Sequence, residues 1–367
     1  MRRTWLVGVL VMVACGDLPP TVPPAVQAVV DYGRQTQWMT NGPDPWEVFV
    51  CHVPPDSTSP VYAGLPLRLA LTPERVSTLL DEFVVDYFEA LSNGAYRPSF
   101  SAGAEVTITV DDEPQACVDE ALQSASGNAD GVIVVADAEH NSGEPGGFGN
   151  PGACARPPCN ASTSRRSVYV GGADFSTDWG DRPPMDLIEH EIGHALGWPH
   201  SGYDKASSEP LRSALDVMSN SAAPRAVDPD RRDAPDTLAI NRLTAGWLPV
   251  SAVKVVPPNG GIVALAPSNG SSGTRLAVIA LDDHRFLTIE LLVAEGLDAH
   301  VPASGIAVHL IEGSDATRTQ TPLVGRPPYD DLLAPGETLT SHGWSIAIGD
   351  GWRVTAHPVA DAPTVSG

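Results

Sequence analysis

The sequence of 367 residues (38.5 kDa) is long enough for about two domains of ordinary size, and its 42% of hydrophobic residues excludes wholesale disorder. Gly and Pro number 34 and 35, whereas aromatic residues make up only 6%, which favours a loop-rich, partly β architecture over a long helical bundle. Acidic residues outnumber basic ones by 45 to 22, and a surface with a formal net charge of −23 repels phosphate backbones, so we expect no nucleic-acid partner.

The N-terminus has the pattern of an export signal. Arg2 and Arg3 precede an apolar stretch over 5–14 that is too short to span a membrane. The stretch ends at Val-Ala-Cys-Gly around Cys15, which resembles the lipobox of bacterial lipoproteins, where the cysteine carries the lipid; an ordinary cleavable signal is the alternative. We therefore expect a signal segment over 1–15, a Pro-rich tether over 16–45, and a cell-envelope lipoprotein or a secreted protein. Membrane contact is expected only through the N-terminal lipid anchor.

Four cysteines remain after Cys15, namely Cys51, Cys117, Cys154 and Cys159. An even number in an exported chain favours two disulfides, and the short turn between residues 154 and 159 favours that pair together with 51–117. The alternative is a zinc site formed by all four, although no pair has the two-residue spacing of a zinc knuckle. Cys51 as a ligand that keeps an enzyme latent ranks below a disulfide.

Strands and two main helices alternate in the pattern expected over 46–248. Thr72, Pro73 and Glu74 predict a helix start, apolar residues at helical spacing continue to Leu91, and Asn93 with Gly94 ends the helix. A second helix is predicted over 183–196. Strands are predicted at 46–53, 105–110, 131–136 and 167–171. The Gly-, Pro- and Cys-rich loop over 137–165 either overhangs a cleft or is a surface loop. The order predicts an α+β domain.

The composition changes after residue 248, because the remainder has no helical pattern. Short strands separated by turn signals predict a separate all-β, sandwich-like domain over 249–367, serving docking or substrate recognition. The predicted strands are 252–256, 261–265, 275–280, 286–292, 306–311, 345–348 and 352–357.

The chemistry of the sequence lies in 190–200, which reads His-Glu-Ile-Gly-His-Ala-Leu-Gly-Trp-Pro-His. On a helix, His190 and His194 lie one turn apart on one face, so both imidazoles can bind one cation. Gly197 can adopt the positive φ that ends the helix and returns His200 to the metal. Three histidines leave one position of a tetrahedral zinc site open for water, and Glu191 is placed to accept a proton from that water.

This motif is similar to that of the metzincin zinc endopeptidases at every ligand, base and glycine position. The methionine turn of that family corresponds to 216–219, where the resemblance implies that Met218 packs under the ligands as a hydrophobic floor. Segments 88–94 and 238–248 resemble the gametolysin-like and immune-inhibitor-A-like branches. The resemblance covers 46–248 and implies a metzincin-type catalytic domain with a mixed twisted sheet and two main helices.

The resemblance also implies a strand that binds substrate. In the family, a peptide adds as an antiparallel neighbour to an edge strand before the active helix, and the candidates here are Ser167, Val168, Tyr169 and Val170. Tyr203 lies near the metal ligands in sequence, and either stabilises an oxyanion or packs.

A calcium site is a further candidate. Asp228, Asp230, Asp233 and Asp236 supply carboxylates, but their spacing does not match the calcium loop of helix–loop–helix proteins, and a solvated acidic loop is the preferred interpretation.

Together these patterns predict a monomeric zinc-dependent endopeptidase that hydrolyses protein or peptide substrates, with Glu191 as general base and acid. One alternative is a surface binding or adhesion protein on a protease scaffold, which has no use for Glu191. Another is a zinc amidase that acts on cell-wall amides.

Overall fold

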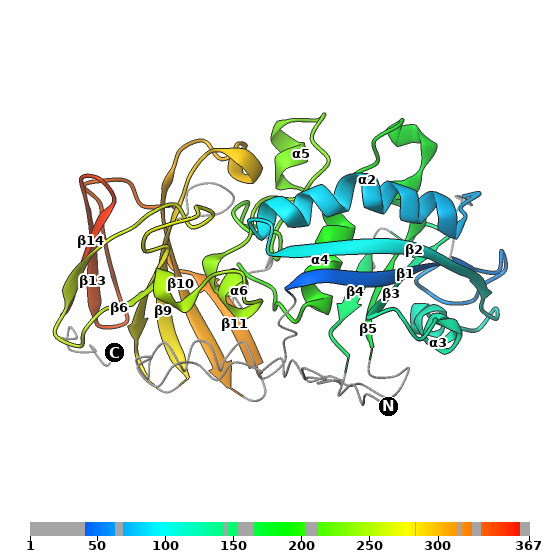
Figure 1. Cartoon of the computed structure of the whole chain (residues 1–367), viewed down its shortest axis with the longest axis horizontal. Helices are drawn as coiled ribbons and strands as arrows, with labels where there is room; N and C mark the ends of the chain where they lie inside the picture. Colours follow the sequence, from blue (N-terminus) through cyan, green and yellow to red (C-terminus); the bar gives the residue numbers. More distant parts are fainter. Residues whose placement is uncertain are drawn as a thin grey trace, which may run out of the picture.

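The computed structural model describes residues 41–62, 69–141, 146–152, 165–202, 212–282, 284–314, 317–324 and 332–359. This part of the chain is mixed α+β with three sheets and few helices, and its C-terminal part is β-rich, as expected (Figure 1). The predictions for Cys15, Cys154, Cys159 and Tyr203 concern positions outside the described residues. Among the described helices, none is both long and apolar enough to cross a membrane.

The N-terminal half is built on a five-stranded sheet with the strand order β2-β1-β3-β5-β4. The strands are β1 (Gly42–His52), β2 (Tyr96–Thr107), β3 (Gly131–Ala136), β4 (Gly147–Asn150) and β5 (Arg166–Val170). Neighbouring strands are parallel except for β4, which pairs antiparallel with β5. Every residue of β3 and β5 is buried, because separate apolar clusters cover the two faces of the sheet.

Helix α2 (Pro73–Leu91) lies along one face of this sheet, beside β2 (Figure 1). Its start is as predicted, since the Thr72 hydroxyl accepts a hydrogen bond from the first turn. At its end Asn93 takes a φ of 54°, and the N–H of Gly94 donates to the Glu89 carbonyl over 2.8 Å. The buried face of α2 belongs to the main apolar cluster of this half, which also contains residues of the second main helix.

Several elements in this half differ from the sequence predictions. Strand β2 begins at Tyr96 rather than 105. Pro98 argues against a strand here because proline has no N–H for pairing, but β2 is an edge strand, which tolerates that loss. Strand β1 begins at Gly42, inside the predicted tether 16–45. Helix α3 (Pro114–Ser124) was not predicted.

A disulfide joins Cys51 of β1 to Cys117 of α3, with 5.8 Å between their Cα atoms. This is the predicted pairing, and it fixes α3 against the sheet. It excludes the alternative zinc site of four cysteines and a latency role for Cys51, since both require a free thiolate.

A buried ion pair joins three strands of the sheet. Arg166 of β5 donates to Asp44 of β1 through both terminal nitrogens, one of them over 2.9 Å. The same carboxylate accepts from the Tyr96 hydroxyl of β2 over 2.6 Å and from the Trp46 indole over 2.9 Å. Both charges are therefore desolvated and mutually dependent, which makes either one costly to remove alone.

The C-terminal half contains two sheets, with the orders β11-β10-β9-β8-β6 and β12-β13-β14-β7. Their strands are β6 (Val253–Val255), β7 (Gly261–Ala264), β8 (Leu276–Ala280), β9 (Arg285–Leu292), β10 (Gly305–Ser314), β11 (Thr317–Pro322), β12 (Thr338–Ser341), β13 (Trp344–Gly349) and β14 (Arg353–Pro358). Strands β11 and β12 were not predicted, because both are rich in Thr and poor in apolar residues. Both lie at sheet edges.

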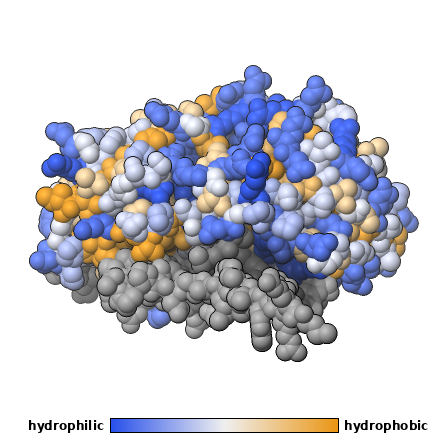
Figure 2. Space-filling view, viewed as in Figure 1, coloured by the Kyte–Doolittle hydropathy of each residue, from blue (hydrophilic) through white to orange (hydrophobic). Residues whose placement is uncertain are grey.

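The two halves share apolar contacts across the predicted boundary at 248. Helix α6 (Ala239–Thr244), shorter than the expected 238–248, packs in one cluster with residues of β8 and β9. The remaining short helices are α5 (Ala223–Val227), η2 (Gly172–Phe175), η3 (Thr177–Trp179), η4 (Val250–Ala252) and η5 (Gly296–Asp298). The face seen in Figure 2 is largely hydrophilic, in keeping with the high net charge, and its hydrophobic residues gather most clearly over the C-terminal strands.

Candidate metal centre

Helix α4 (Asp186–Ala195) carries His190, Glu191 and His194. It begins three residues after the predicted start at 183, and packs against β4 and β5. The His190 and His194 rings lie one turn apart on the same face, with their centroids 4.7 Å from each other. The helix thus places two imidazoles side by side, as its spacing predicts.

The chain turns sharply after α4 and returns the third histidine. Gly197 has a φ of 91°, its N–H donates to the His194 carbonyl over 2.8 Å, and the N–H of Trp198 donates to the Gly193 carbonyl over 3.0 Å. These two bonds and the left-handed glycine form a Schellman motif. A residue with a side chain would be strained at this φ, so Gly197 has the mechanical role that the sequence predicts.

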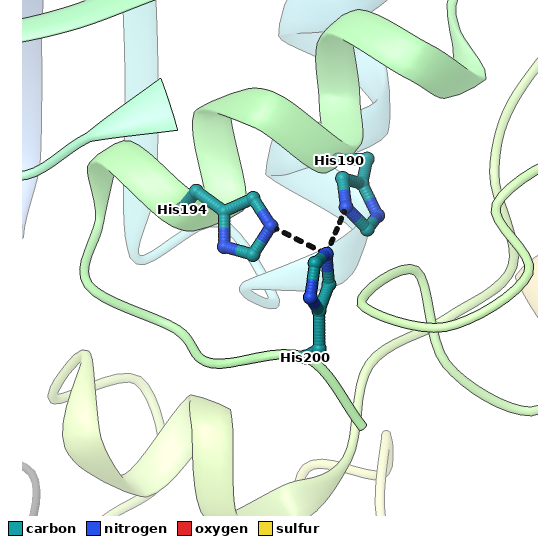
Figure 3. Close-up of side chains that lie close together, drawn as sticks. All are labelled: His190, His194 and His200. Atoms are coloured by element: carbon teal, nitrogen blue, oxygen red, sulfur yellow. Dashed lines mark hydrogen bonds between the residues drawn. The ribbon is translucent and has the colours of Figure 1, made fainter. Parts of the chain in front are cut away.

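Three imidazole nitrogens converge as a result (Figure 3). The Nε2 atom of His200 lies 3.2 Å from Nε2 of His190 and 2.9 Å from Nε2 of His194. Tetrahedral zinc with Zn–N distances of about 2.0–2.1 Å places its nitrogen ligands about 3.3 Å apart. The cluster therefore fits a single metal ion. Within the described ranges, no other group of three or more His, Cys, Asp or Glu side chains converges in this way.

The second ring nitrogen of two ligands is held by the backbone. His190 Nδ1 donates to the Val217 carbonyl over 2.6 Å, and His194 Nδ1 donates to the Trp198 carbonyl over 2.9 Å. A carbonyl oxygen can only accept, so Nδ1 carries the proton and the Nε2 lone pair faces the centre of the cluster. Burial lowers the pKa of His190 to about 4 and of His194 to about 3, and it lowers that of His200. All three are neutral at neutral pH, the form that binds metal.

Glu191 follows the first histidine and is almost fully buried, with 4% of its surface exposed. Burial raises the pKa of its carboxyl to about 8, against a smaller opposing effect of the Gly149 backbone N–H. Its Oε2 atom has no hydrogen-bond partner among the described residues. A desolvated carboxyl group with an unpartnered oxygen, one residue after the first histidine on α4, is a candidate for proton exchange with a ligand at the metal position.

Met218 is fully buried and packs beneath α4 at Gly193. A Cβ atom at Gly193 would overlap the Met218 sulfur and lie 3.0 Å from the Trp198 ring, so this turn of the helix needs a glycine. The preceding residue, Val217, is the one whose carbonyl holds His190. The turn at 216–219 therefore contacts both α4 and the first histidine of the cluster.

The edge-strand prediction at Ser167, Val168, Tyr169 and Val170 is wrong. These residues belong to β5, which is fully buried between β3 and β4. The prediction took the last strand before α4 as the edge, but the chain places the antiparallel strand β4 outside it. Among the described residues, the edge strand on this side of the sheet is β4.

Strand β4 can lie against α4 because of its glycines. A Cβ atom at Gly149 would overlap the Glu191 carbonyl oxygen and lie 2.7 Å from the His194 Cβ. At Gly147 it would lie 2.6 Å from the Tyr169 carbonyl oxygen and 3.1 Å from the Glu191 Cγ. Sequence reasoning missed this element, although glycines two residues apart match the period of one strand face.

The four aspartates considered as calcium ligands do not form a cluster in the structure. Asp236 pairs with Arg242 in the interior, whereas Asp233 pairs with Arg182 over 3.1 Å near the surface. Asp228 accepts from the backbone N–H of Asp230 over 3.1 Å. The Asp228, Asp233 and Asp236 carboxylates therefore have separate partners, and no three of the four carboxylates converge on one point.

Comparisons with known proteins add little to this geometry. No protein-family model matches the chain, and no curated protein matches it. Among solved structures, the chain is similar to one described as "Structure of a chaperone-substrate complex", at 13% identity and a TM-score of 0.27. The match covers 57% of this chain and 39% of that chain, so the chain spans less than half of its length. A likeness this weak carries no information on fold or function.

Proposed function

We propose that the chain is a zinc-dependent endopeptidase of metzincin type that hydrolyses protein or peptide substrates. The observation that carries the proposal is the convergence of the His190, His194 and His200 nitrogens, with the buried Glu191 next to His190 on the same helix. Three neutral imidazoles are a ligand set that suits zinc, and three protein ligands rather than four are typical of catalytic zinc sites.

The roles of the residues follow from their positions. Zinc bound by the three histidines would acidify a water molecule and polarise the scissile carbonyl. Glu191 accepts the proton of the attacking water on its carboxylate and later donates it to the leaving amine. Burial of Glu191 favours this task, because it raises the proton affinity of the carboxyl towards that of the groups it must serve. The Val217 and Trp198 carbonyls keep two imidazoles in the required tautomer.

A peptide substrate is favoured by the edge strand beside the site. Strand β4 pairs with β5 on one side and has no strand on the other among the described residues. Its Gly147 and Gly149 lie against Glu191 and His194, so a peptide added to the open side would run past the histidine cluster. Backbone pairing of this kind gives affinity that depends little on sequence.

Export to an oxidising compartment is part of the proposal. The Cys51–Cys117 disulfide supports it, because structural disulfides persist mainly outside the cytosol. The lipobox-like segment around Cys15 extends this to a cell-envelope lipoprotein.

The test combines metal analysis with proteolysis. Purified protein is expected to contain about one zinc per chain and to cut denatured casein until a chelator is added. Glu191→Gln keeps the shape and the histidines but loses the base, so we expect full zinc content and a fall of kcat/KM by about 100-fold or more. A metal-free wild type, or undiminished cleavage by Glu191→Gln, would contradict the proposal. Binding of casein without cleavage would indicate an adhesion protein, and release of cell-wall material alone would indicate an amidase.

A further inference from the structure

The third histidine differs from the other two in how it is held. His190 and His194 stand on a helix, whereas His200 lies in an irregular segment that follows the Gly197 turn. The position of an imidazole on such a segment depends on how firmly the neighbouring backbone is held. The contacts of Ser201 and Gly202 therefore decide where His200 can be.

The C-terminal half supplies part of those contacts. Ser201 forms a parallel bridge with Gln320 of β11, and the N–H of Gly202 donates to the Gln320 carbonyl over 2.9 Å. On the other side, the N–H of Ser201 donates to the Met218 carbonyl over 3.0 Å. The segment after His200 thus lies between the methionine turn and β11, an outer strand that begins more than a hundred residues later in the chain.

A series of hydrogen bonds between buried side chains also links Gln320 to Ser201. Gln320 Nε2 donates to Asn241 Oδ1 over 2.8 Å, and Asn241 Nδ2 donates to the Thr237 hydroxyl over 3.0 Å. That hydroxyl donates to Asp216 Oδ1 over 3.0 Å, and the Ser201 hydroxyl donates to Asp216 Oδ2 over 2.5 Å. Each donor has an acceptor and each of the five residues is at most 1% exposed. Gln320 Oε1 is the exception, since it has no hydrogen-bond partner among the described residues. The network joins Ser201 to β11 through four consecutive hydrogen bonds, so removing an inner member breaks two of them.

We propose that Gln320 is a positioning residue of the metal centre, through which the C-terminal β half fixes the place of His200. Gln320 touches neither the metal position nor a reacting atom. It holds the backbone of residues 201–202 through its carbonyl, and its side chain ends the network that holds Ser201. The C-terminal half then has a role in forming the site, in addition to any docking role. The inference depends on the metal-binding part of the proposed function.

The test measures zinc affinity, not only activity. Gln320→Ala removes the side chain, and Gln320→Glu keeps its size but replaces the amide that donates to Asn241 with a carboxyl. We expect both to lower zinc affinity by about 10–100-fold in chelator competition, the range for residues that orient metal ligands. The cobalt-substituted protein should show an altered visible spectrum in both. Thr288→Val is the matched control: it removes an equally buried hydroxyl from β9, two strands away from β11, and should leave zinc affinity unchanged.

The outcomes separate the two hypotheses. A wild type that binds no zinc would refute the metal centre itself. Zinc binding by the wild type that is equally tight in folded Gln320→Ala and Gln320→Glu would refute the positioning role alone. Amide hydrogen exchange of the metal-free wild type gives a check that needs no variant: the Gly202 amide should be protected like the amides inside β10, and rapid exchange there would overturn the inference.

Discussion

Gly149→Ala should separate β4 from α4 and lower both the stability of the fold and the affinity for zinc. The added methyl carbon would overlap the Glu191 carbonyl oxygen and would lie 2.7 Å from the His194 Cβ and 2.9 Å from the Glu191 carbonyl carbon. Carbon atoms in contact are normally about 3.5–4.0 Å apart, so strand and helix must separate by about 1 Å. None of these three atoms is the free end of a flexible side chain, so the backbone itself has to move.

The cost follows from two effects. Overpacking of a tight contact costs about 1–3 kcal/mol. A shift of this size also weakens hydrogen bonds between the four-residue strand β4 and β5, each worth about 1 kcal/mol. We expect the free energy of unfolding to fall by about 2–4 kcal/mol. Zinc affinity should fall too, because Glu191 and His194 belong to the displaced surface.

Urea unfolding and chelator competition measure these two quantities. Gly127→Ala is the matched control, because its Cβ would meet no atom within 4 Å. Stability within about 0.5 kcal/mol of the wild type, the usual range of harmless surface changes, would refute the close approach of β4 to α4.

Three further outcomes are expected. Zinc at 100 times its dissociation constant should stabilise the protein by about 2.7 kcal/mol, so a chelator should lower the melting temperature of the wild type but not of His194→Ala. Asp44→Ala should cost about 3–5 kcal/mol in urea unfolding by leaving Arg166 buried and unpaired, and adding Arg166→Met should recover part of the loss. Burial raises the pKa of Glu290 from 4.5 to about 7, so the folded chain keeps this proton to a higher pH than the unfolded chain. Stability should therefore fall between these pH values by up to about 1.4 kcal/mol per pH unit, and Glu290→Gln should flatten that fall.

Local signals in the sequence located the centre of the site well. The spacing of His190 and His194 requires only helical geometry, and the turn at Gly197 requires only the permissive backbone of glycine. The helix start at Thr72 and the buried strand β3 are equally local, and the structure has both. Features that depend on a few neighbouring residues were therefore predictable.

Features that depend on distant pairing were not. Which strand lies at the sheet edge is decided by how the chain passes from β3 to β5, and no local pattern of residues 167–170 records it. Strand β11 has polar, Thr-rich residues, and its pairing with Ser201 joins positions more than a hundred residues apart. Likewise, the spacing of the four aspartates does not reveal whether they bind one cation together or pair with separate groups, as Asp233 does with Arg182 and Asp236 with Arg242.

The two edge strands of the N-terminal sheet, β2 and β4, differ in how readily they can pair with an added strand. Along β2, Pro98 interrupts the row of backbone donors, and the outward residues Arg97, Ser99 and Ser101 add charge and polarity. Such a border resists recruitment of another polypeptide and so protects against fibrous self-association. The opposite edge strand, β4, has two glycines among its four residues and neither a proline nor a charged side chain, so within the described part of the chain that edge lacks this protection. A sheet with one protected edge can pair with an added strand at the other edge without extending into a fibre at both.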